Sequence, residues 1–437
     1  MAIIDELNNL QTSIVTVKKV LADNIKAKGV SVSENDTLTT LSNAVKNIPQ
    51  GGGGSITIPE GTRFGYSTFQ TLPNELVSYM NTLDNYQRIY YDCDSMVTAD
   101  MSSLTNISNV KEMTYMFGNN NKLEHIIFPE GLKPYRLLDT FRDCKVLTNV
   151  NIEDLDLSEC ITLKECFYNC SGLTTVTFPA TLSEDLTTID GMFYNCSGLT
   201  TVTLPTTFPS DTYIDCGSLF ENCYNLSTVN NLNNLKKVKK INNTFKSCAS
   251  GLTEVVWNTI DYNGGHIESV FEGCKTLNTI EINNGTYIIS NPFESNFFKY
   301  GFRNCSALTT CSMSNITINL PQSWNGYGIS ITNMFEGCSG LTEINLSNWT
   351  IGGFSGTTTT NINDLQNMFK NCTALTTINF SGWDMLQCKV NSNMFQGCNS
   401  LSTIIMNNCS DESIAKMQSI INNNGKQDQV TIITDDI

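Results

Sequence analysis

The sequence predicts an α/β repeat solenoid, in which similar units coil around one long core and each coil adds a strand to a parallel β-sheet. Three observations predict this fold. The phrase Phe-x-x-Cys-x-x-Leu-x-x-(Ile/Val) recurs along the 437 residues, its copies are evenly spaced, and each copy runs into alternating apolar and polar residues. One unit cannot bury its apolar face alone, so we expect the units to stack in a right-handed coil.

Eleven phenylalanines mark the copies of this phrase. They are 24 to 27 residues apart, except in three successive units, where the separation grows to 31, 33 and 34 residues. Copies in this number and at this spacing do not arise by chance. The marking residues are Phe117, Phe141, Phe167, Phe193, Phe220, Phe245, Phe271, Phe302, Phe335, Phe369 and Phe395.

Each unit has the same expected parts. A short helical turn ends at the phenylalanine. The residue before the cysteine is mostly Gly, Asn or Asp, which tolerate the left-handed backbone of a chain reversal. A strand follows, as in residues 173–178, where Val176 and Phe178 alternate with Thr175 and Thr177. We expect the threonines to face outward and the apolar residues to face the core.

Ten of the seventeen cysteines occupy one position of the repeat. Equivalent side chains of a solenoid point the same way, so their Cβ atoms do not converge as a disulfide requires. No CxxC pair accompanies them, and His125 and His266 are the only histidines. We expect buried, reduced thiols rather than metal ligands or disulfides at Cys144, Cys170, Cys196, Cys223, Cys248, Cys274, Cys305, Cys338, Cys372 and Cys398.

Composition and charge exclude several classes of function. The 26 basic and 42 acidic residues give a net charge of −16, which disfavours nucleic acid as a partner. No apolar stretch reaches about 18 residues, so we expect no membrane insertion, and the first residues do not resemble a secretory signal. With two histidines in separate units and scattered carboxylates, we predict no catalytic residue, no cofactor, no metal and no enzyme activity.

The repeat also resembles a known family. The phrase (Met/Gly/Thr)-Phe-x-x-Cys-x-x-Leu-Thr-x-Ile is similar to bacterial leucine-rich repeats of the BspA type. The segments Leu346-Ser347-Asn348-Trp349 and Phe380-Ser381-Gly382-Trp383 resemble the related mycoplasma-lipoprotein repeats. The resemblance covers about residues 104–405. It implies a right-handed leucine-rich-repeat array with a parallel β-sheet face and short helical turns, and a role in adhesion or binding.

Residues 1–50 predict a small helical module for docking or oligomerisation. Leu7, Leu10, Ile14, Val17 and Leu21 step by three and four residues, as in a short heptad seam. The seam fits a hairpin packed on its own chain, a coiled coil that joins several copies, or a docking plug. A Gly-rich linker follows at residues 51–55.

The phrase from Val20 to Val30, followed by Thr37-Leu38 and residues 45–48, resembles N-terminal modules of phage tail-fibre and minor structural proteins. This resemblance implies that the N-terminal helices bind other virion proteins and that several copies, or a homo-oligomer, sit on a particle.

The solenoid proper is expected at residues 104–409, between two caps. Residues 56–103 are rich in aromatic residues and form the expected N-terminal cap. Residues 410–437 form the C-terminal cap, with a helix at 411–422 that carries Ile414, Met417 and Ile421 on one face and a strand at 430–434.

Two surfaces are candidates for ligand or partner binding. The outward strand positions are mostly small and polar, which is also typical of a plain soluble sheet. The three long units carry aromatic residues on inserts, which suit recognition loops but could also fill the core of longer coils. These aromatic residues are Tyr287, Phe293, Phe297, Phe298, Tyr300, Trp324, Tyr327 and Phe354. Trp257, Trp349 and Trp383 are expected to be structural.

Two hypotheses of function follow. The first is a non-enzymatic phage virion protein, such as a tail-fibre, minor structural or decoration protein, whose solenoid binds a host-surface protein, a glycan or another virion protein. The alternative is a bacterial cell-surface adhesin or secreted interaction protein with BspA-type repeats.

Overall fold

The computed structural model describes Lys19, Ala22 and residues 80–435, except 82, 84, 94, 106, 108–109, 266, 290–295, 321–328 and 354–361. The chain divides into two compact units, Met1–Phe64 and Gly65–Ile437. The expected helical seam and the linker at 51–55 lie outside the described residues, and so do Leu7, Leu10, Ile14, Val17 and Leu21.

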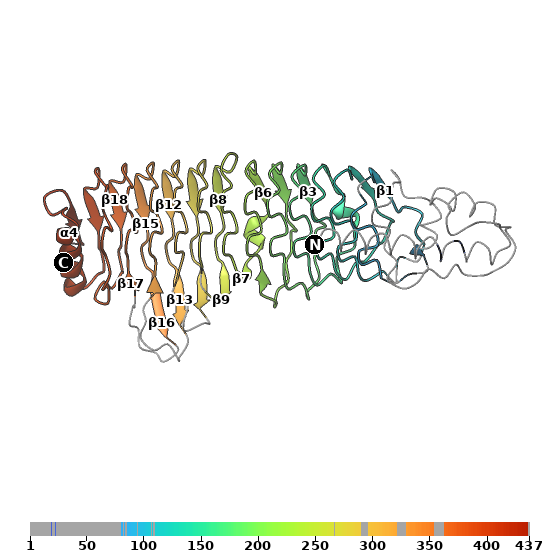
Figure 1. Ribbon diagram of the computed structural model, residues 1–437. Coiled ribbons are helices and arrows are strands. Elements are labelled where there is room, and N and C mark those ends of the chain that lie inside the picture. Colours follow the sequence, from blue (N-terminus) through green and yellow to red (C-terminus); the bar gives the residue numbers. More distant parts are fainter. Residues whose placement is uncertain are drawn as a thin grey trace. The chain divides into compact units, whose positions relative to one another are not determined.

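The second unit is a solenoid of stacked coils, and most coils place a strand in one row along the same side (Figure 1). All pairings in this row are parallel, so the expected parallel β-solenoid is confirmed. The row forms three sheets: β1-β2, β3-β4-β6 and a seven-stranded sheet from β8 to β20. Its strands are β1 (Thr98–Asp100), β2 (His125–Ile127), β3 (Thr175–Thr177), β4 (Thr201–Thr203), β6 (Thr228–Asn230), β8 (Glu254–Val256), β10 (Thr279–Glu281), β12 (Thr310–Ser312), β15 (Glu343–Asn345), β18 (Thr377–Asn379), β19 (Thr403–Ile405) and β20 (Thr431–Ile433).

The strands pair in register, so equivalent residues of neighbouring coils lie side by side. Thr175 pairs with Thr201, and Val176 pairs with Val202. The central residue of each strand is buried in most coils, whereas the residues on either side are exposed or half-buried. This confirms the outward orientation that the period-2 alternation predicted.

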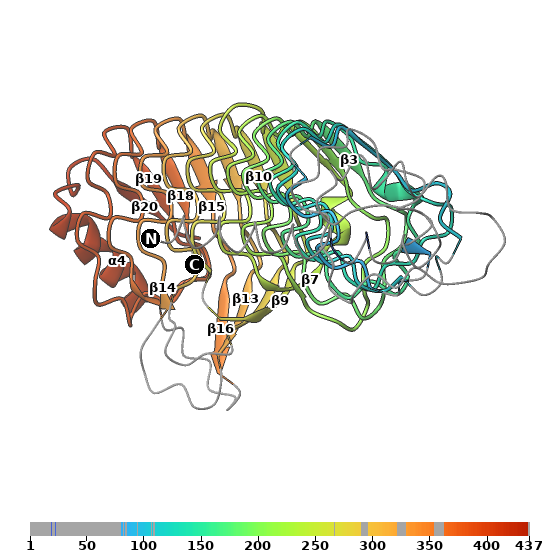
Figure 2. The same cartoon turned by 45° about the vertical axis from the view of Figure 1, so that its right-hand side comes forward.

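A second parallel sheet runs along the coils, and the sequence pattern had not predicted it. It joins six strands in the order β16-β13-β11-β9-β7-β5, below the first row in Figure 1 and nearer the viewer in Figure 2. Two further strands, β14 (Ile329–Ser330) and β17 (Ile362–Asp364), pair with each other. The six strands are β5 (Ile214–Asp215), β7 (Lys237–Lys240), β9 (Asp261–Gly264), β11 (Thr286–Ile289), β13 (Thr317–Leu320) and β16 (Thr350–Gly353).

The eleven repeat phenylalanines form one continuous stack in the core. Successive ring centroids are 5.0 to 6.3 Å apart and the ring planes differ by 1° to 27°. Tyr90 continues the stack beyond Phe117, at 5.8 Å and 13°. The repeat therefore extends one unit toward the N-terminus, into residues that the sequence pattern had assigned to a cap.

The segment around each phenylalanine is a series of turns, so the expectation of a short helical turn was wrong. Two residues per unit have left-handed backbones, as at Glu165 (φ 51°) and Asn169 (φ 62°). Successive backbone N–H groups donate in turn within their own coil and to the next coil. The Tyr168 N–H donates to the Glu165 carbonyl of its own coil (3.0 Å), whereas the Phe167 N–H donates to the Met192 carbonyl of the next coil (2.9 Å). Helical bonding cannot continue because every second N–H is committed to the neighbouring coil.

The left-handed residue before the cysteine was predicted correctly in all ten cysteine units, including Ser247, where φ is 63°. Among the described residues from 111 to 435, the helical elements are η2 (Ile152–Asp154), η3 (Leu232–Asn234) and α4 (Asp411–Asn423).

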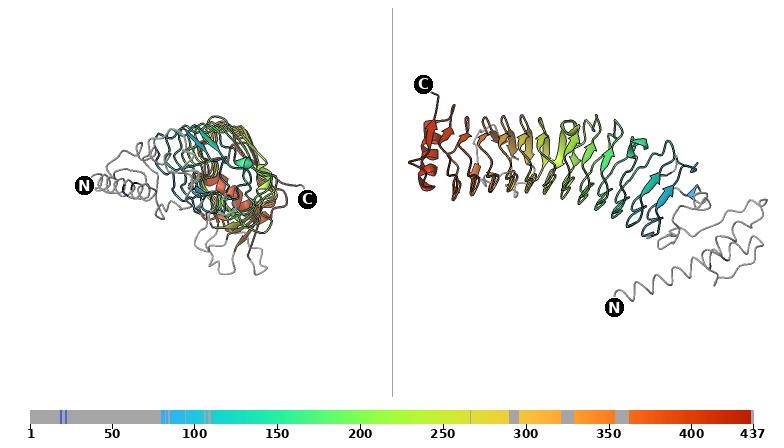
Figure 3. Two further views of the ribbon diagram at one scale, coloured as in Figure 1. Left: turned by 90° about the vertical axis from the view of Figure 1, so that its right-hand side faces the viewer. Right: turned by 90° about the horizontal axis from the view of Figure 1, so that it is seen from above.

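The last coil is covered by α4 and β20, as the C-terminal pattern predicted (Figure 3). The Ser410 side chain caps α4 by accepting a hydrogen bond from the Ser413 N–H. Met417, Ile420 and Ile421 are buried against the core, whereas Ile414 is only half-buried. The helix thus shields apolar surface that the end of a solenoid would otherwise expose.

Candidate binding surface

Three of the predicted binding aromatics belong to the core, so the recognition-loop interpretation is wrong for them. Tyr287, Phe297 and Phe298 have no exposed surface. Phe297 packs edge-on against Tyr287 at 5.1 Å and against Phe298 at 5.0 Å, and Phe298 stacks on Phe302 of the main stack. The extra length of this coil encloses more volume, and these rings fill it.

The other predicted site residues divide into two groups. Tyr300 is half-buried, with the Arg303 guanidinium 4.3 Å from the centre of its ring. Phe293, Trp324, Tyr327 and Phe354 lie outside the described residues, so their role stays a prediction.

The three described tryptophans are structural, as predicted. Trp257, Trp349 and Trp383 are buried, and each indole N–H donates to a backbone carbonyl of an earlier coil. For Trp257 the acceptor is Leu235, at 2.7 Å. These side chains tie coils together and are not available to a partner.

The outer face of the seven-stranded sheet presents the most regular exposed surface. Its outward positions carry three exposed carboxylates, Glu254, Glu281 and Glu343, and no lysine or arginine from β8 to β20. A shallow groove of about 320 Å³ crosses β10, β12, β15, β18 and β19. Glu281 and Glu343 lie in this groove among threonine, serine and asparagine side chains. The face is therefore acidic and rich in hydrogen-bonding groups.

Hydroxyl groups hold the edge of this face in place. Thr342 donates to the Thr309 carbonyl at 3.1 Å, and Thr376 donates to the Thr342 carbonyl at 2.9 Å. Thr309 and Ser402 extend the same ladder in either direction. Each coil is thus bonded to the next beside the strands, and the outward side chains stand on a rigid support.

Three basic residues pair with carboxylates on the turn segments of the solenoid. The residue after each repeat phenylalanine alternates in charge over six coils. Lys246 and Arg303 both pair with Glu272, at 3.7 Å and 2.9 Å, and Lys370 pairs with Glu336 at 3.3 Å. The alternating charges cancel along this ladder, so the acidic sheet face is left without a compensating cation on the outward positions of its strands.

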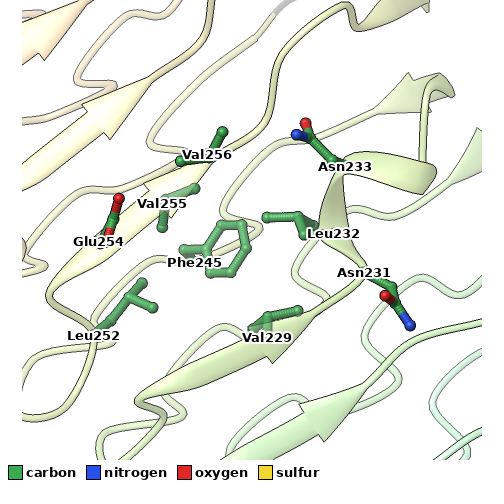
Figure 4. A pocket seen from close by; sticks show the side chains of 9 residues that line it. All are labelled: Val229, Asn231, Leu232, Asn233, Phe245, Leu252, Glu254, Val255 and Val256. Carbon is green, nitrogen blue, oxygen red and sulfur yellow. The ribbon is translucent and has the colours of Figure 1, made fainter.

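The row of strands is interrupted between β6 and β8, which do not pair. A cavity of about 210 Å³ lies at this break (Figure 4). Apolar side chains of Val229, Leu232, Phe245, Leu252 and Val255 line it, and Glu254 stands at its edge. One irregularity in the sequence marks this place. Three residues, rather than two, separate Cys248 from Leu252.

Neither a metal centre nor a membrane-spanning helix is found among the described residues. They contain no group of three or more His, Cys, Asp or Glu side chains placed to hold a metal ion. His125 is exposed on β2 beside Glu124. No helix in the described part of the chain is both long and apolar enough to cross a membrane.

These features define a class: a leucine-rich-repeat β-solenoid of about eleven turns, whose repeats are typical of protein–protein interaction or surface binding. The chain belongs to the family described as BspA type leucine rich repeat region. That family model matches residues 54–159, 86–219, 113–253 and 190–299, which together cover more than half of the chain. Residues 297–432 match the family described as Mycoplasma protein of unknown function, DUF285.

Three solved structures resemble the chain only distantly. An LRR protein of Leptospira interrogans is 12% identical, with a TM-score of 0.22, over 85% of this chain and 94% of that one. A TLR13–ssRNA13 complex is 14% identical, with a TM-score of 0.24, over 78% of this chain and 51% of that one. The Toll–Spatzle complex of Drosophila is 13% identical, with a TM-score of 0.27, over 78% of this chain and 49% of that one. The chain thus spans about half the length of the TLR13 and Toll chains. No curated protein matches it.

The comparisons bear unequally on the two hypotheses of function. Neither matched family is a phage virion family, so the expected phage tail-fibre module gains no support. The bacterial alternative fits both matched families better. No enzyme family matches, and a repeat solenoid of this kind is typically non-catalytic.

Proposed function

We propose that this protein is a non-catalytic binding protein of a bacterial cell surface, and that the outer face of its seven-stranded sheet holds a positively charged protein partner. The exposed carboxylates of Glu254, Glu281 and Glu343, on strands without an outward lysine or arginine, carry this proposal. The matched BspA-type repeats support a binding role in general.

The physical argument rests on rigidity and charge. Parallel strands lie about 4.8 Å apart, so the outward side chains form a fixed array that loses little conformational entropy on binding. A one-sign field over this array attracts basic surfaces, raises the association rate and repels acidic partners. Threonine, serine and asparagine in the groove supply hydrogen bonds that fix the register of the partner.

Charge reversal tests the proposal. Peptides of equal length with positive, zero and negative net charge are passed over the immobilised full-length chain. The variant Glu254→Lys/Glu281→Lys/Glu343→Lys should bind the positive peptides at least about threefold more weakly, because each rim ion pair contributes about 0.2–1 kcal/mol. The variant Glu130→Lys/Glu153→Lys/Asp185→Lys makes the same charge change at exposed residues outside these strands and should retain binding.

Equal losses in the two variants would show that only net charge matters and would contradict a site on the sheet. Stronger binding of the negative peptides to the unmodified chain would contradict it as well.

A further inference from the structure

The interruption between β6 and β8 is a built feature of the solenoid. Every other cysteine unit of the repeat has two residues between its cysteine and its leucine, whereas Ala249, Ser250 and Gly251 separate Cys248 from Leu252. The additional residue lies just before β8, the strand that does not pair with β6. From β8 to β20 the pairing is continuous, and the only other interruption among the described strands of the row lies between β2 and β3.

Hydrogen bonds at both ends of the break join the coil of β6 to the coil of β8. Before the strands, the Ser250 N–H donates to the Tyr224 carbonyl at 2.9 Å. After them, the Trp257 indole donates to Leu235 at 2.7 Å, and the Asn258 N–H donates to the Asn233 Oδ1 at 2.8 Å. Hydrogen bonds between the two coils, before and after β6 and β8, therefore fix the gap between these strands.

The break leaves a core position uncovered. Val229 is half-buried, although its equivalents Val176, Val202 and Val255 are between 0 and 4% exposed. The cavity beneath it has a volume of about 210 Å³ and reaches Phe245 of the main stack. This pocket is open to solvent, and Asn231 and Asn233 also line it, but its volume exceeds the roughly 150 Å³ of an enclosed apolar cavity that accepts benzene, so it has room for an aromatic or large aliphatic side chain.

The rim of the cavity selects the chemistry of the occupant. Glu254 is exposed at its edge, and no basic residue lines it. The facing edges of β6 and β8 are unpaired and can bond to the backbone of an extended segment. We propose that this cavity receives an apolar side chain, of the size of phenylalanine or leucine, from an extended segment of a protein partner, with a basic residue of that segment beside Glu254.

This inference rests on the proposed function and deepens it, because it gives the partner of the acidic face an anchor. A ring that becomes buried on binding is the kind of contact that dominates protein–protein binding energies. The acidic groove over β10 to β19 then contacts the remainder of the partner.

Dipeptide probes test the pocket directly. The full-length chain, labelled at its Ile, Leu and Val methyl groups, is titrated with N-acetyl-Phe-Lys-amide and followed by NMR. Shifts should concentrate on the methyl groups of Val229, Leu232, Leu252 and Val255. N-acetyl-Ala-Lys-amide should give no shift at these groups. N-acetyl-Phe-Glu-amide should bind about two- to fivefold more weakly, as expected for one exposed ion pair.

Two variants close the pocket by different routes. Val229→Phe fills it, and deletion of Ala249 restores the two-residue spacing of the other units. Each should weaken Phe-Lys binding about tenfold or more, whereas Val146→Phe, which adds the same ring at an exposed valine, should not. Folding is checked by unchanged methyl shifts in the coils from β12 to β19. If Val229→Phe does not fold, the variant that lacks Ala249 provides the test of the pocket.

Shifts spread over the whole sheet face, or binding that survives both closures, would overturn the proposal. So would the absence of any shift up to the solubility limit of the probe. Glu281→Lys/Glu343→Lys separates this inference from the proposed function, because it weakens an acidic sheet site and leaves the dipeptide pocket intact.

Discussion

The thiol of Cys170 donates a hydrogen bond to the backbone carbonyl of Phe141 in the preceding coil, with sulphur and oxygen 3.0 Å apart. The same carbonyl accepts the N–H of Cys144 in its own coil, at 3.1 Å. All ten repeat cysteines make the equivalent thiol bond, at 3.0 to 3.2 Å. Both lone pairs of a buried carbonyl are thus used. The cysteines are buried, as predicted, but they also bond coil to coil.

The first phenylalanine unit shows that a donor is needed at this position. Asn120 stands where later units have cysteine, and it is fully buried. Its amide donates to the Tyr90 carbonyl of the preceding coil at 2.8 Å and to the Phe117 carbonyl at 2.9 Å. An amide therefore replaces the thiol in the bond to the preceding coil, and it makes further bonds to the Phe117 carbonyl and, through its oxygen, to the Cys93 N–H.

Removing one such thiol should weaken the solenoid. Cys196→Ala removes the bond to the Phe167 carbonyl and leaves a small cavity, so we expect a loss of about 1–3 kcal/mol in the free energy of unfolding. Denaturant titration followed by circular dichroism measures it. Cys409→Ala is the control, because Cys409 is half-buried and its thiol contacts are 3.6 Å long. Its loss should stay within about 0.5 kcal/mol.

Few thiols of the native protein should react with a labelling reagent. The repeat thiols are inaccessible, and burial raises the pKa of the Cys144 and Cys398 thiols to about 12, so little reactive thiolate forms at neutral pH. Cys409 should react first, and Cys409→Ser should remove the fast phase. Labelling of several thiols per native molecule before unfolding would disagree with the structure.

Alkaline pH should destabilise the fold through these thiols. Burial raises the pKa of Cys144 and of Cys160 from 9.0 to about 12. The folded state therefore holds these protons more tightly than the unfolded chain, so this stabilisation is complete below about pH 9 and is lost as pH rises toward 12. Each thiol contributes a slope of about 1.4 kcal/mol per pH unit in that window.

The measurement is the free energy of unfolding between pH 8 and about 11. Cys144→Ala should show a shallower decline with pH than the unmodified chain. Identical slopes would mean that the Cys144 thiol does not titrate differently in the folded and unfolded states.

Arg142 is the most connected charge described on the turn segment. It bonds Asp139 at 2.8 Å, pairs with Glu165, and lies 3.9 Å from the centre of the Tyr168 ring. Asp139 is only 4% exposed. Arg142→Ala should therefore cost about 2–4 kcal/mol, because it leaves this carboxylate buried without its cation.

Denaturant titration of a double variant isolates that cause. Asp139→Asn keeps a residue that tolerates the left-handed backbone (φ 52°) but removes the charge. Arg142→Ala/Asp139→Asn should recover at least about 1 kcal/mol relative to Arg142→Ala. No recovery would attribute the loss to packing against Tyr168 instead.

The sequence by itself determined the parts of this protein that repeat. A phrase that returns every 26 residues or so places its Phe, Cys and Leu one above another, because each coil must bury the same face against the next. In nine of the ten cysteine units, the left-handed residue before the cysteine could be predicted from its Gly, Asn or Asp identity. The same holds for the outward side chains of the strands and for the helix that ends the solenoid, where local chemistry is sufficient.

Only the tertiary structure decided the features that depend on how neighbouring coils fit. Tyr287, Phe297 and Phe298 looked like loop aromatics, but the longer coils close over them and make them core. The left-handed Glu165 carries no sequence signal, because its conformation follows from hydrogen bonds to the next coil. The extra residue before Leu252 was visible in the sequence, but the cavity beside it could be found only in the structure, where β6 and β8 do not pair. Contacts between coils are long-range in the chain, and a local pattern does not encode their geometry.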